Sequence, residues 1–345
     1  MKKALITGFR GQDGAYLSQL LLSKGYEVYG ADRSGDAGLW RLRELGLQGR
    51  VNEIYMDILE LTNIMDALQR IQPDEVYNFA AQSFVKMSFD QPILTAEINA
   101  VGVVRLLEAI RKSCPAARFY QASTAELFGS TCSAQQNEGH NFHPKSPYGV
   151  SKLYAHWITV NYRDIYGLHA SNGISYNHES PLRGEEFVTR KITAAAARIR
   201  KGLQSSVTVG NMEARRDWGY AKEYVEGMWL MLQRPKAGDY VLATGEVHSV
   251  REFIEAAFSS AGFHLKWSGK GLEEKGLDSE TGRTLVEVSK EFYRQCEVDV
   301  LTGDASKAKA ELGWAPKVKF QDLVALMVEA DIKRLEGPGG AAATR

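Results

Sequence analysis

The fold is decided by residues 3–14, which read KALITGFRGQDG. A short apolar strand is followed by a GxxGxxG turn, and the turn opens a helix that carries a leucine stripe at Leu17, Leu20 and Leu21. Glycines at these places allow a tight turn, and they let backbone N–H groups and the helix dipole approach a pyrophosphate. The stretch predicts a dinucleotide site, with an ordinary glycine-rich βα turn as the alternative.

The same alternation of strand and helix continues through the first half of the chain. Amphipathic stretches at 64–71 and 101–110 separate the further strands, which we expect at residues 27–31, 53–56, 75–79 and 118–121. A βαβ rhythm of this kind implies a parallel sheet. We therefore predict an α/β protein with a Rossmann-type doubly wound parallel sheet and a smaller mixed α/β substrate domain.

The pattern changes after about residue 176, which suggests a boundary between two domains. A polar stretch at 177–190 precedes an expected helix at 191–201 and a strand at 207–210. We assign residues 1–175, together with about 215–250, to the dinucleotide-binding domain. Residues 176–214 and 251–336 are assigned to the domain that binds the substrate, and residues 337–345 to a disordered tail.

Composition limits the classes of function that remain. The 345 residues hold 42 basic and 42 acidic side chains, and this balance argues against a nucleic-acid-binding protein. No apolar run is long enough for a membrane span, and the N-terminus lacks the features of a signal peptide, so we expect a cytoplasmic protein without membrane contact. We also expect no metal. His140 and His143, near Glu138, form a short His-x-x-His in a polar loop, and this pair lacks a third close ligand. The three cysteines have no CxxC spacing.

The end of the second strand normally decides between the two nicotinamide cofactors. A carboxylate there accepts both ribose hydroxyls, whereas an arginine pairs with a 2′-phosphate. This chain has both, at Asp32 and Arg33. The pattern leaves NAD and NADP open.

A phenol and an ammonium, Tyr148 and Lys152, stand four residues apart and share one helix face. The ammonium favours the phenolate and can reach the ribose of a bound nucleotide, so the pair suits a general base. Upstream, the strand that ends in Gln121-Ala122-Ser123-Thr124 places Thr124 at the carboxyl end of a parallel strand, where open α/β sheets bind ligands.

Glu126 lies two residues beyond Thr124. A carboxylate beside a hydride-transfer site can remove a carbon-bound proton and return it to a leaving hydroxyl. A solvated glutamate at the start of a helix is the alternative interpretation.

Long segments of the chain resemble the extended short-chain dehydrogenase/reductases, and among them the GDP-mannose 4,6-dehydratases. These segments include PDEVYNFAAQS at 73–83, RFYQASTAELFG at 118–129, SPYGVSKLYAHWITVNY at 146–162, NHESPLRGEEFVTRKIT at 177–193 and GNMEARRDWG at 210–219. The resemblance implies a catalytic tetrad of Thr124, Glu126, Tyr148 and Lys152.

We assign two sets of binding residues alongside the tetrad. The dinucleotide site takes Gly8, Arg10, Gly11, Gln12, Asp13, Gly14, Asp32, Arg33, Asp57, Ala80, Ala81 and Gln82, together with Tyr148 and Lys152. The resemblance implies that the GDP-sugar is held by Asn177, Val188, Lys191, Gly210, Arg216, Arg294 and Glu297, and we add Ser83. Lys191, Arg216 and Arg294 supply cations for two phosphates, although Arg215 and Arg216 would otherwise be taken as a surface charge run.

The activity implied is the conversion of GDP-mannose to GDP-4-keto-6-deoxymannose with loss of water. The alternatives are the same reaction on a GDP-manno-heptose, a GDP-4-keto-6-deoxy-sugar reductase, and a catalytically silent NAD(P)-binding protein. The family implies NADP and a homotetramer, with a dimer second. Asp32-Arg33-Ser34 stands where the family usually has two adjacent arginines, which makes NAD a close second, and we favour NADP because Arg33 remains and Arg10 could supply a second cation.

Overall fold

The computed structural model describes residues 1–33, 38–129, 135–292 and 300–336. The chain divides into two compact units, which are described separately. The first contains residues 1–176, 221–245 and 302–316, and the second contains residues 177–220, 246–301 and 317–345.

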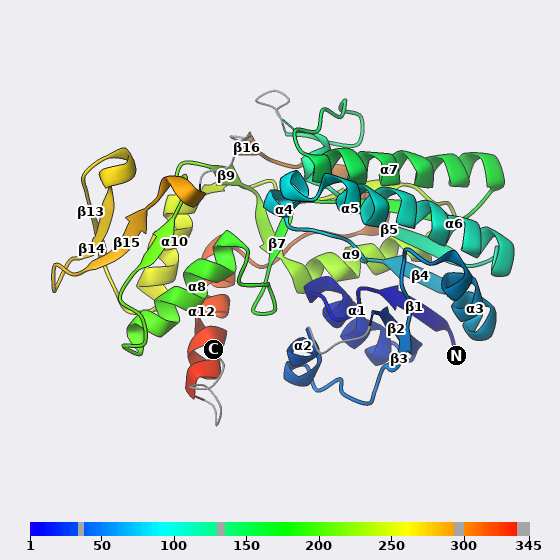
Figure 1. Ribbon diagram of the computed structural model, residues 1–345, viewed down its shortest axis with the longest axis horizontal. Helices are drawn as coiled ribbons and strands as arrows, with labels where there is room; N and C mark the ends of the chain where they lie inside the picture. Colours follow the sequence, from blue (N-terminus) through cyan, green and yellow to red (C-terminus); the bar gives the residue numbers. More distant parts are fainter. Residues whose placement is uncertain (34–37, 130–134, 293–299, 337–345) are drawn as a thin grey trace. The chain divides into compact units, whose positions relative to one another are not determined.

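The first unit is built on a parallel sheet (Figure 1). Within the described residues this sheet has seven strands in the order β11-β6-β5-β4-β1-β2-β3. Every neighbouring pair is parallel, and the order reverses direction between β1 and β4. The strands are β1 (Lys3–Thr7), β2 (Glu27–Asp32), β3 (Asn52–Tyr55), β4 (Glu75–Asn78), β5 (Arg118–Thr124), β6 (Ala170–Ser175) and β11 (Asp239–Leu242). This is the doubly wound arrangement, in which ligands bind at the carboxyl ends of the strands beside the switch point.

Helices of the first unit pack in two groups. On one side α3, α6 and α7 bury a cluster with the sheet that includes Leu68, Leu106 and Phe119, while α1 packs against α9. The helices are α1 (Gln12–Ser23), α2 (Leu39–Glu44), α3 (Leu61–Ile71), α4 (Val85–Asp90), α5 (Pro92–Ala96), the π-helix η1 (Glu97–Val101), α6 (Gly102–Ser113), the 3₁₀ turn η2 (Ala125–Leu127), α7 (Pro147–Tyr166), α9 (Ala221–Gln233) and α11 (Ser306–Leu312).

The long helix α7 has clear sequence signals at both ends. The Ser146 hydroxyl accepts a hydrogen bond from the Gly149 N–H at 3.0 Å, and Pro147 occupies the first helical position. Gly167 ends the helix in the left-handed conformation, with φ of 70°. The start of the helix therefore fixes Tyr148 in its first turn.

Residues 302–316 belong to the first unit, whereas the sequence analysis placed all of 251–336 in the second. Helix α11 packs against β11 and α9, which accounts for the difference. The Lys307 ammonium donates to the Asp239 carbonyl at 2.9 Å, and the Tyr240 hydroxyl donates to the Glu311 carboxylate at 2.8 Å. Residues 215–220 and 246–250, assigned by sequence to the first domain, lie in the second unit. There β10 (Trp218–Tyr220) pairs with β7 (Asn177–Glu179), and β12 (His248–Ser249) pairs with β9 (Arg215–Arg216).

The second unit combines helices with small sheets. Helices α8, α10 and α12 enclose a core that includes Phe253, Phe258 and Val286. Its sheets have the strand orders β10-β7, β12-β9-β16 and β13-β14-β15-β8. The elements are β7 (Asn177–Glu179), α8 (Val188–Arg200), β8 (Val207–Val209), β9 (Arg215–Arg216), β10 (Trp218–Tyr220), β12 (His248–Ser249), α10 (Val250–Ser260), β13 (Leu265–Ser268), η3 (Gly271–Glu273), β14 (Lys275–Asp278), β15 (Thr284–Val288), η4 (Lys290–Phe292), β16 (Val300–Leu301) and α12 (Phe320–Glu336).

The predicted fold class, a Rossmann-type parallel sheet with a smaller mixed unit, is confirmed. Each predicted strand exists, with ends displaced by a few residues; β5 continues to Thr124 because its pairing with β6 runs on to Ser175. Across the described residues, no helix is both long and apolar enough to span a membrane. The tail predicted at 337–345 lies outside the described residues.

Candidate active site

Two glycines of the turn, Gly8 and Gly14, leave no room for a side chain. Gly8 has φ of 65°, and a Cβ there would lie 3.0 Å from the Ala80 nitrogen; at Gly14 it would lie 2.4 Å from the Phe9 Cα. The turn therefore sits directly against the loop that follows β4. Helix α1 begins at Gln12 without a side-chain cap on its N-terminal N–H groups, so the cradle fits a pyrophosphate.

A chain of buried polar side chains joins the ends of β1 and β4 to the middle of β5. The Thr7 hydroxyl donates to Asn78 Oδ1 at 2.6 Å and accepts the N–H groups of Phe79 and Ala80, each at 3.1 Å. Asn78 donates to Gln121 Oε1 at 2.8 Å. Thr7, Asn78 and Gln121 are each 1% exposed, so the network is fixed and shielded from water.

The network ends at the Lys152 ammonium. The Ala122 carbonyl accepts the Gln121 side-chain amide and Lys152 Nζ, both at 3.0 Å. Lys152 Nζ lies 5.9 Å from the centre of the Tyr148 ring, on the same side of α7. Burial lowers the pKa of Lys152 to about 8, and the negative charge of Asp13 opposes that shift. A phenol and a buried ammonium are therefore held together at the carboxyl end of β5.

Thr124 ends β5, and Glu126 lies in the turn η2 that follows it, against helix α7. The Thr124 hydroxyl accepts the Glu126 N–H at 3.2 Å and so caps the short turn η2. Helix α7 packs on η2, and a Cβ at Gly149 would lie 3.1 Å from the Glu126 carbonyl. The structure thus brings the four predicted tetrad residues together within one unit.

The loop predicted to bind the cofactor, Ala80 to Gln82, is clamped by Asn99. Asn99 accepts the Gln82 N–H at 2.8 Å and donates to the Gln82 carbonyl at 2.9 Å. The Asn99 amide also donates to the Ser151 hydroxyl at 3.2 Å, and Ser151 donates to the Tyr148 carbonyl at 2.7 Å. Asn99 lies in the π-helix η1, a distortion often found at functional sites.

The end of β2 and the neighbouring glycine turn carry one acidic and several basic side chains. Asp32 accepts the Arg33 N–H at 2.8 Å, and burial raises the pKa of Asp32 while Arg10 and Arg33 oppose that rise. The guanidinium of Arg10 pairs with Glu53 at 2.7 Å. The Arg41 guanidinium donates to the Arg10 carbonyl at 3.2 Å and adds a further cation beside the glycine turn.

Asp57 occupies the loop after β3, where it orders the backbone. Its N–H donates to Asn63 Oδ1 and its carboxylate accepts the Leu59 N–H, each at 3.0 Å. The Met56 N–H donates to the Asp32 carbonyl at 3.0 Å, so this loop lies beside the end of β2.

The residues predicted to hold the GDP-sugar fall in two places. Ser83 is exposed on the loop after β4 in the first unit. In the second unit Asn177 begins β7, Val188 and Lys191 lie in the first turn of α8, and Gly210 follows β8. Arg216 lies in β9 and is only 6% exposed, which disfavours the surface charge run, whereas Arg215 is exposed. Arg294 and Glu297 lie outside the described residues.

Sequence reasoning missed the residues that hold the site in shape, namely Thr7, Asn78, Asn99, Gln121 and Arg41. Thr7 and Asn78 end two buried strands with polar side chains, which is a usable signal in retrospect. Asn99 and Gln121 carry no such signal, because their partners are more than 15 residues away or in a neighbouring strand.

Candidate metal ligands in the polar loop have other partners. Glu138 accepts the Val241 N–H at 2.6 Å, and His140 Nδ1 lies 3.0 Å from Asn137 Oδ1. In the described ranges, no group of three or more His, Cys, Asp or Glu side chains could hold a metal ion.

Comparison with known proteins shows which family this chain resembles. A protein-family model described as GDP-mannose 4,6 dehydratase matches residues 5–327. The chain is 50% identical over 344 residues to a GDP-mannose 4,6-dehydratase of Sinorhizobium fredii (strain HH103), covering 97% of this chain and 98% of that protein. It is 47% identical over 340 residues to a GDP-mannose 4,6 dehydratase of Homo sapiens, covering 96% and 91%.

Among solved structures, the chain is similar to a UDP-glucose 4-epimerase of Thermus thermophilus in complex with NAD. The TM-score is 0.77 at 27% identity, and the match covers 95% of this chain and 98% of that chain. The likeness extends over both units.

Proposed function

The chain belongs to the GDP-mannose 4,6-dehydratase family, and on that premise we propose how its own residues carry out the reaction. It is a sugar-nucleotide 4,6-dehydratase, a hydro-lyase of the NAD(P)-binding short-chain dehydrogenase/reductases. GDP-mannose becomes GDP-4-keto-6-deoxymannose with loss of one water. The observation that carries the mechanism is the convergence of Thr124, Glu126, Tyr148 and Lys152 at the carboxyl end of β5.

The dinucleotide fits the first unit. The uncapped start of α1 and the side-chain-free turn at Gly8 suit the pyrophosphate, and the loop at Ala80 to Gln82 is fixed beside them by Thr7 and Asn99. When bound, NAD(P) supplies the acceptor for the C4 hydride and later the donor of that hydride to C6.

Tyr148 acts as the base that begins the oxidation. Its phenolate takes the proton of the 4-hydroxyl, and the Lys152 ammonium, held 5.9 Å from the ring, favours the phenolate electrostatically. The Thr124 hydroxyl donates to the 4-oxygen as charge develops there.

Glu126 carries out the elimination. The 4-keto group acidifies the C5 proton, the Glu126 carboxylate removes it, and the resulting acid protonates the departing 6-hydroxyl to give water. Tyr148 then gives its proton to C5, so that both side chains end the cycle as they began. No net proton or hydride is gained or lost by the protein.

For the cofactor, we favour NADP over NAD. Arg33 and Arg41 support this choice, because they add positive charge near the end of β2 for a 2′-phosphate. Arg10, which the sequence suggested as the second cation, is less suited because Glu53 already neutralises it. Denaturing the purified protein and identifying the released dinucleotide tests the choice, and finding NAD alone would show that Asp32 dominates.

For the substrate, we propose that the second unit binds the GDP portion. Lys191 and the buried Arg216 provide cations for the diphosphate. For assembly we propose a homotetramer, with a dimer second.

The dehydratase mechanism is tested by Glu126→Gln. This side chain cannot take the C5 proton, so oxidation at C4 should survive and absorbance at 340 nm from reduced cofactor should accumulate while water loss stops. With the wild type in D₂O, the product should carry deuterium at C5, and C4-deuterated substrate should deliver its label to C6. A product without deuterium at C5, or a C4-deuterated substrate that delivers no label to C6, would instead favour a reductase.

A further inference from the structure

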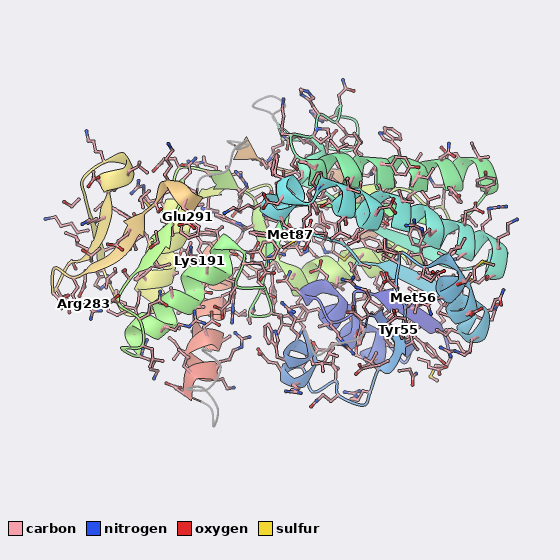
Figure 2. The ribbon with its side chains drawn as sticks, viewed as in Figure 1. Tyr55, Met56, Met87, Lys191, Arg283 and Glu291 are labelled. Atoms are coloured by element: carbon pink, nitrogen blue, oxygen red, sulfur yellow. The ribbon has the colours of Figure 1, made fainter. Side chains whose placement is uncertain are left out.

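In the second unit, two residues proposed to hold the nucleotide lie against Phe292, one against its ring and the other against its backbone. The Lys191 ammonium lies 3.4 Å from the centre of the Phe292 ring. At Gly210 a Cβ would lie 2.3 Å from the Phe292 carbonyl oxygen, so only glycine fits beneath that backbone. Figure 2 labels Lys191 on α8 and Glu291 beside it in η4.

The topology of the unit explains why these residues meet. β15 and β8 are parallel, with Val288 paired to Val209, and the Ser289 N–H donates to the Val209 carbonyl at 2.9 Å. The chain leaves both strands in the same direction, which carries η4 across Gly210. Helix α8 packs on β8 and presents its first turn at that end.

The ring constrains an otherwise flexible side chain. A free lysine samples many rotamers, and ordering it has an entropic cost. An aromatic face attracts an ammonium through its quadrupole. Burial lowers the pKa of Lys191 and the charge of Glu291 opposes that shift, so the ammonium is partly desolvated before any ligand arrives. Phe292 is itself 44% exposed, which leaves the pair accessible to an anion.

We propose that Phe292 is a positioning residue for nucleoside diphosphate binding, which holds the Lys191 ammonium over its ring and orients it toward the diphosphate. The proposal rests on the proposed function, because it takes the GDP portion of the substrate as the ligand of Lys191. It predicts that an aromatic ring, and not merely an apolar side chain, is needed at position 292.

The test is a double-mutant cycle for GDP affinity, measured by isothermal titration calorimetry on the full chain. Phe292→Leu should weaken GDP binding about 3- to 10-fold, the range of a partly exposed cation–π contact. Phe292→Tyr should restore the wild-type affinity. In a Lys191→Met background, Phe292→Leu should have no further effect, because the ring acts through the ammonium.

Trp267→Leu is the matched control. It removes the ring that lies 4.6 Å from the Arg251 guanidinium elsewhere in the same unit, and GDP affinity should not change. An unchanged affinity in Phe292→Leu, or an equal loss with and without Lys191, would overturn the positioning role. If the wild type does not bind GDP at all, the proposed substrate fails together with this inference, and that result is distinct from a wild type that binds GDP and ignores Phe292.

Discussion

Folding changes the pKa of Lys152, the lysine of the candidate site. Its side chain is 5% exposed, and its pKa falls to about 8 because burial disfavours the charged form. One hydrogen bond to the Ala122 carbonyl at 3.0 Å partly compensates for the lost water. Burying this ammonium therefore reduces the stability of the folded protein at neutral pH.

This burial gives a pH-dependent prediction for Lys152→Met. Between pH 8 and about 10.5 the unfolded lysine binds a proton that the folded one has released, so the contribution of Lys152 to the free energy of unfolding rises with pH in this window. The variant lacks that contribution. Urea unfolding at several pH values should show the wild type gaining stability relative to Lys152→Met from pH 8 upward, and a pH-independent difference would mean that the lysine has an ordinary pKa in the folded protein.

Tyr148→Phe tests the base directly. The change removes one hydroxyl from a side chain that is 9% exposed and leaves the Ser151 bond to the Tyr148 carbonyl intact, so the fold should be preserved. Turnover of GDP-mannose should fall by about 10²-fold or more, as expected for loss of a general base. Binding of the dinucleotide, followed by fluorescence, provides the control, and near-normal turnover would contradict the assignment.

At the residue scale, the sequence was sufficient to predict the four proposed catalytic residues, but not the residues that hold them in place. Tyr148, Lys152, Thr124 and Glu126 could be predicted because their spacing within one helix or one strand end places them together. Asn99 and Gln121 could not, because their roles arise only when separate elements meet. The ion pair of Arg10 with Glu53 could not be predicted either, because Glu53 lies 43 residues later in the chain.

At the scale of elements, side chains supply hydrogen bonds to the carboxyl end of β5 where β4 no longer pairs with it. β4 pairs with β5 only as far as Asn78 opposite Gln121, whereas β6 continues to Thr124. Beyond Gln121, the Ala122 carbonyl accepts the Gln121 amide and the Lys152 ammonium. The end of β5 thus also holds Lys152, the lysine proposed to act in catalysis.

Substitution of two buried amides tests whether Gln121 helps to position Lys152. Gln121→Leu and Asn172→Leu each remove an amide that is at most 1% exposed, and each should lower the free energy of unfolding by about 1–3 kcal/mol. Only Gln121→Leu should also reduce turnover of the folded protein, by about tenfold, because Asn172 bonds to His156 and Asp239 and not to the lysine's acceptor. Equal turnover in the two variants would show that Gln121 is only structural.

Element prediction succeeded where contacts are local and failed where they are distant. β1 and α1 could be predicted because apolar runs and glycines mark them in the sequence. The segment 302–316 was misplaced because α11 joins β11 through Lys307 and Glu311, whose partners lie more than 65 residues earlier in the chain.

At the scale of the whole molecule, α7 carries an apolar stripe that the first unit leaves exposed. Val150, Tyr154, Trp157 and Ile165 are 49% to 65% exposed and recur at three- to eight-residue spacing. This spacing places them along one side of the helix, opposite the buried side that holds Tyr148 and Lys152. Exposed apolar side chains that share one side of a helix are typical of a protein interface.

We expect this stripe to pair with α7 of a second copy, which gives the dimeric step of the proposed tetramer. Trp157→Glu combined with Ile165→Lys places charges in the expected interface and should shift the protein to the monomer, because an unpaired charge buried at an interface is strongly unfavourable. Light scattering at micromolar concentration should give two or four times 38.3 kDa for the wild type and 38.3 kDa for the double variant. Leu203→Glu, at a residue 58% exposed in the second unit, is the matched control and should leave the mass unchanged. A wild type with the mass of a monomer, or a double variant that keeps the mass of an oligomeric wild type, would contradict the prediction that α7 forms a subunit interface.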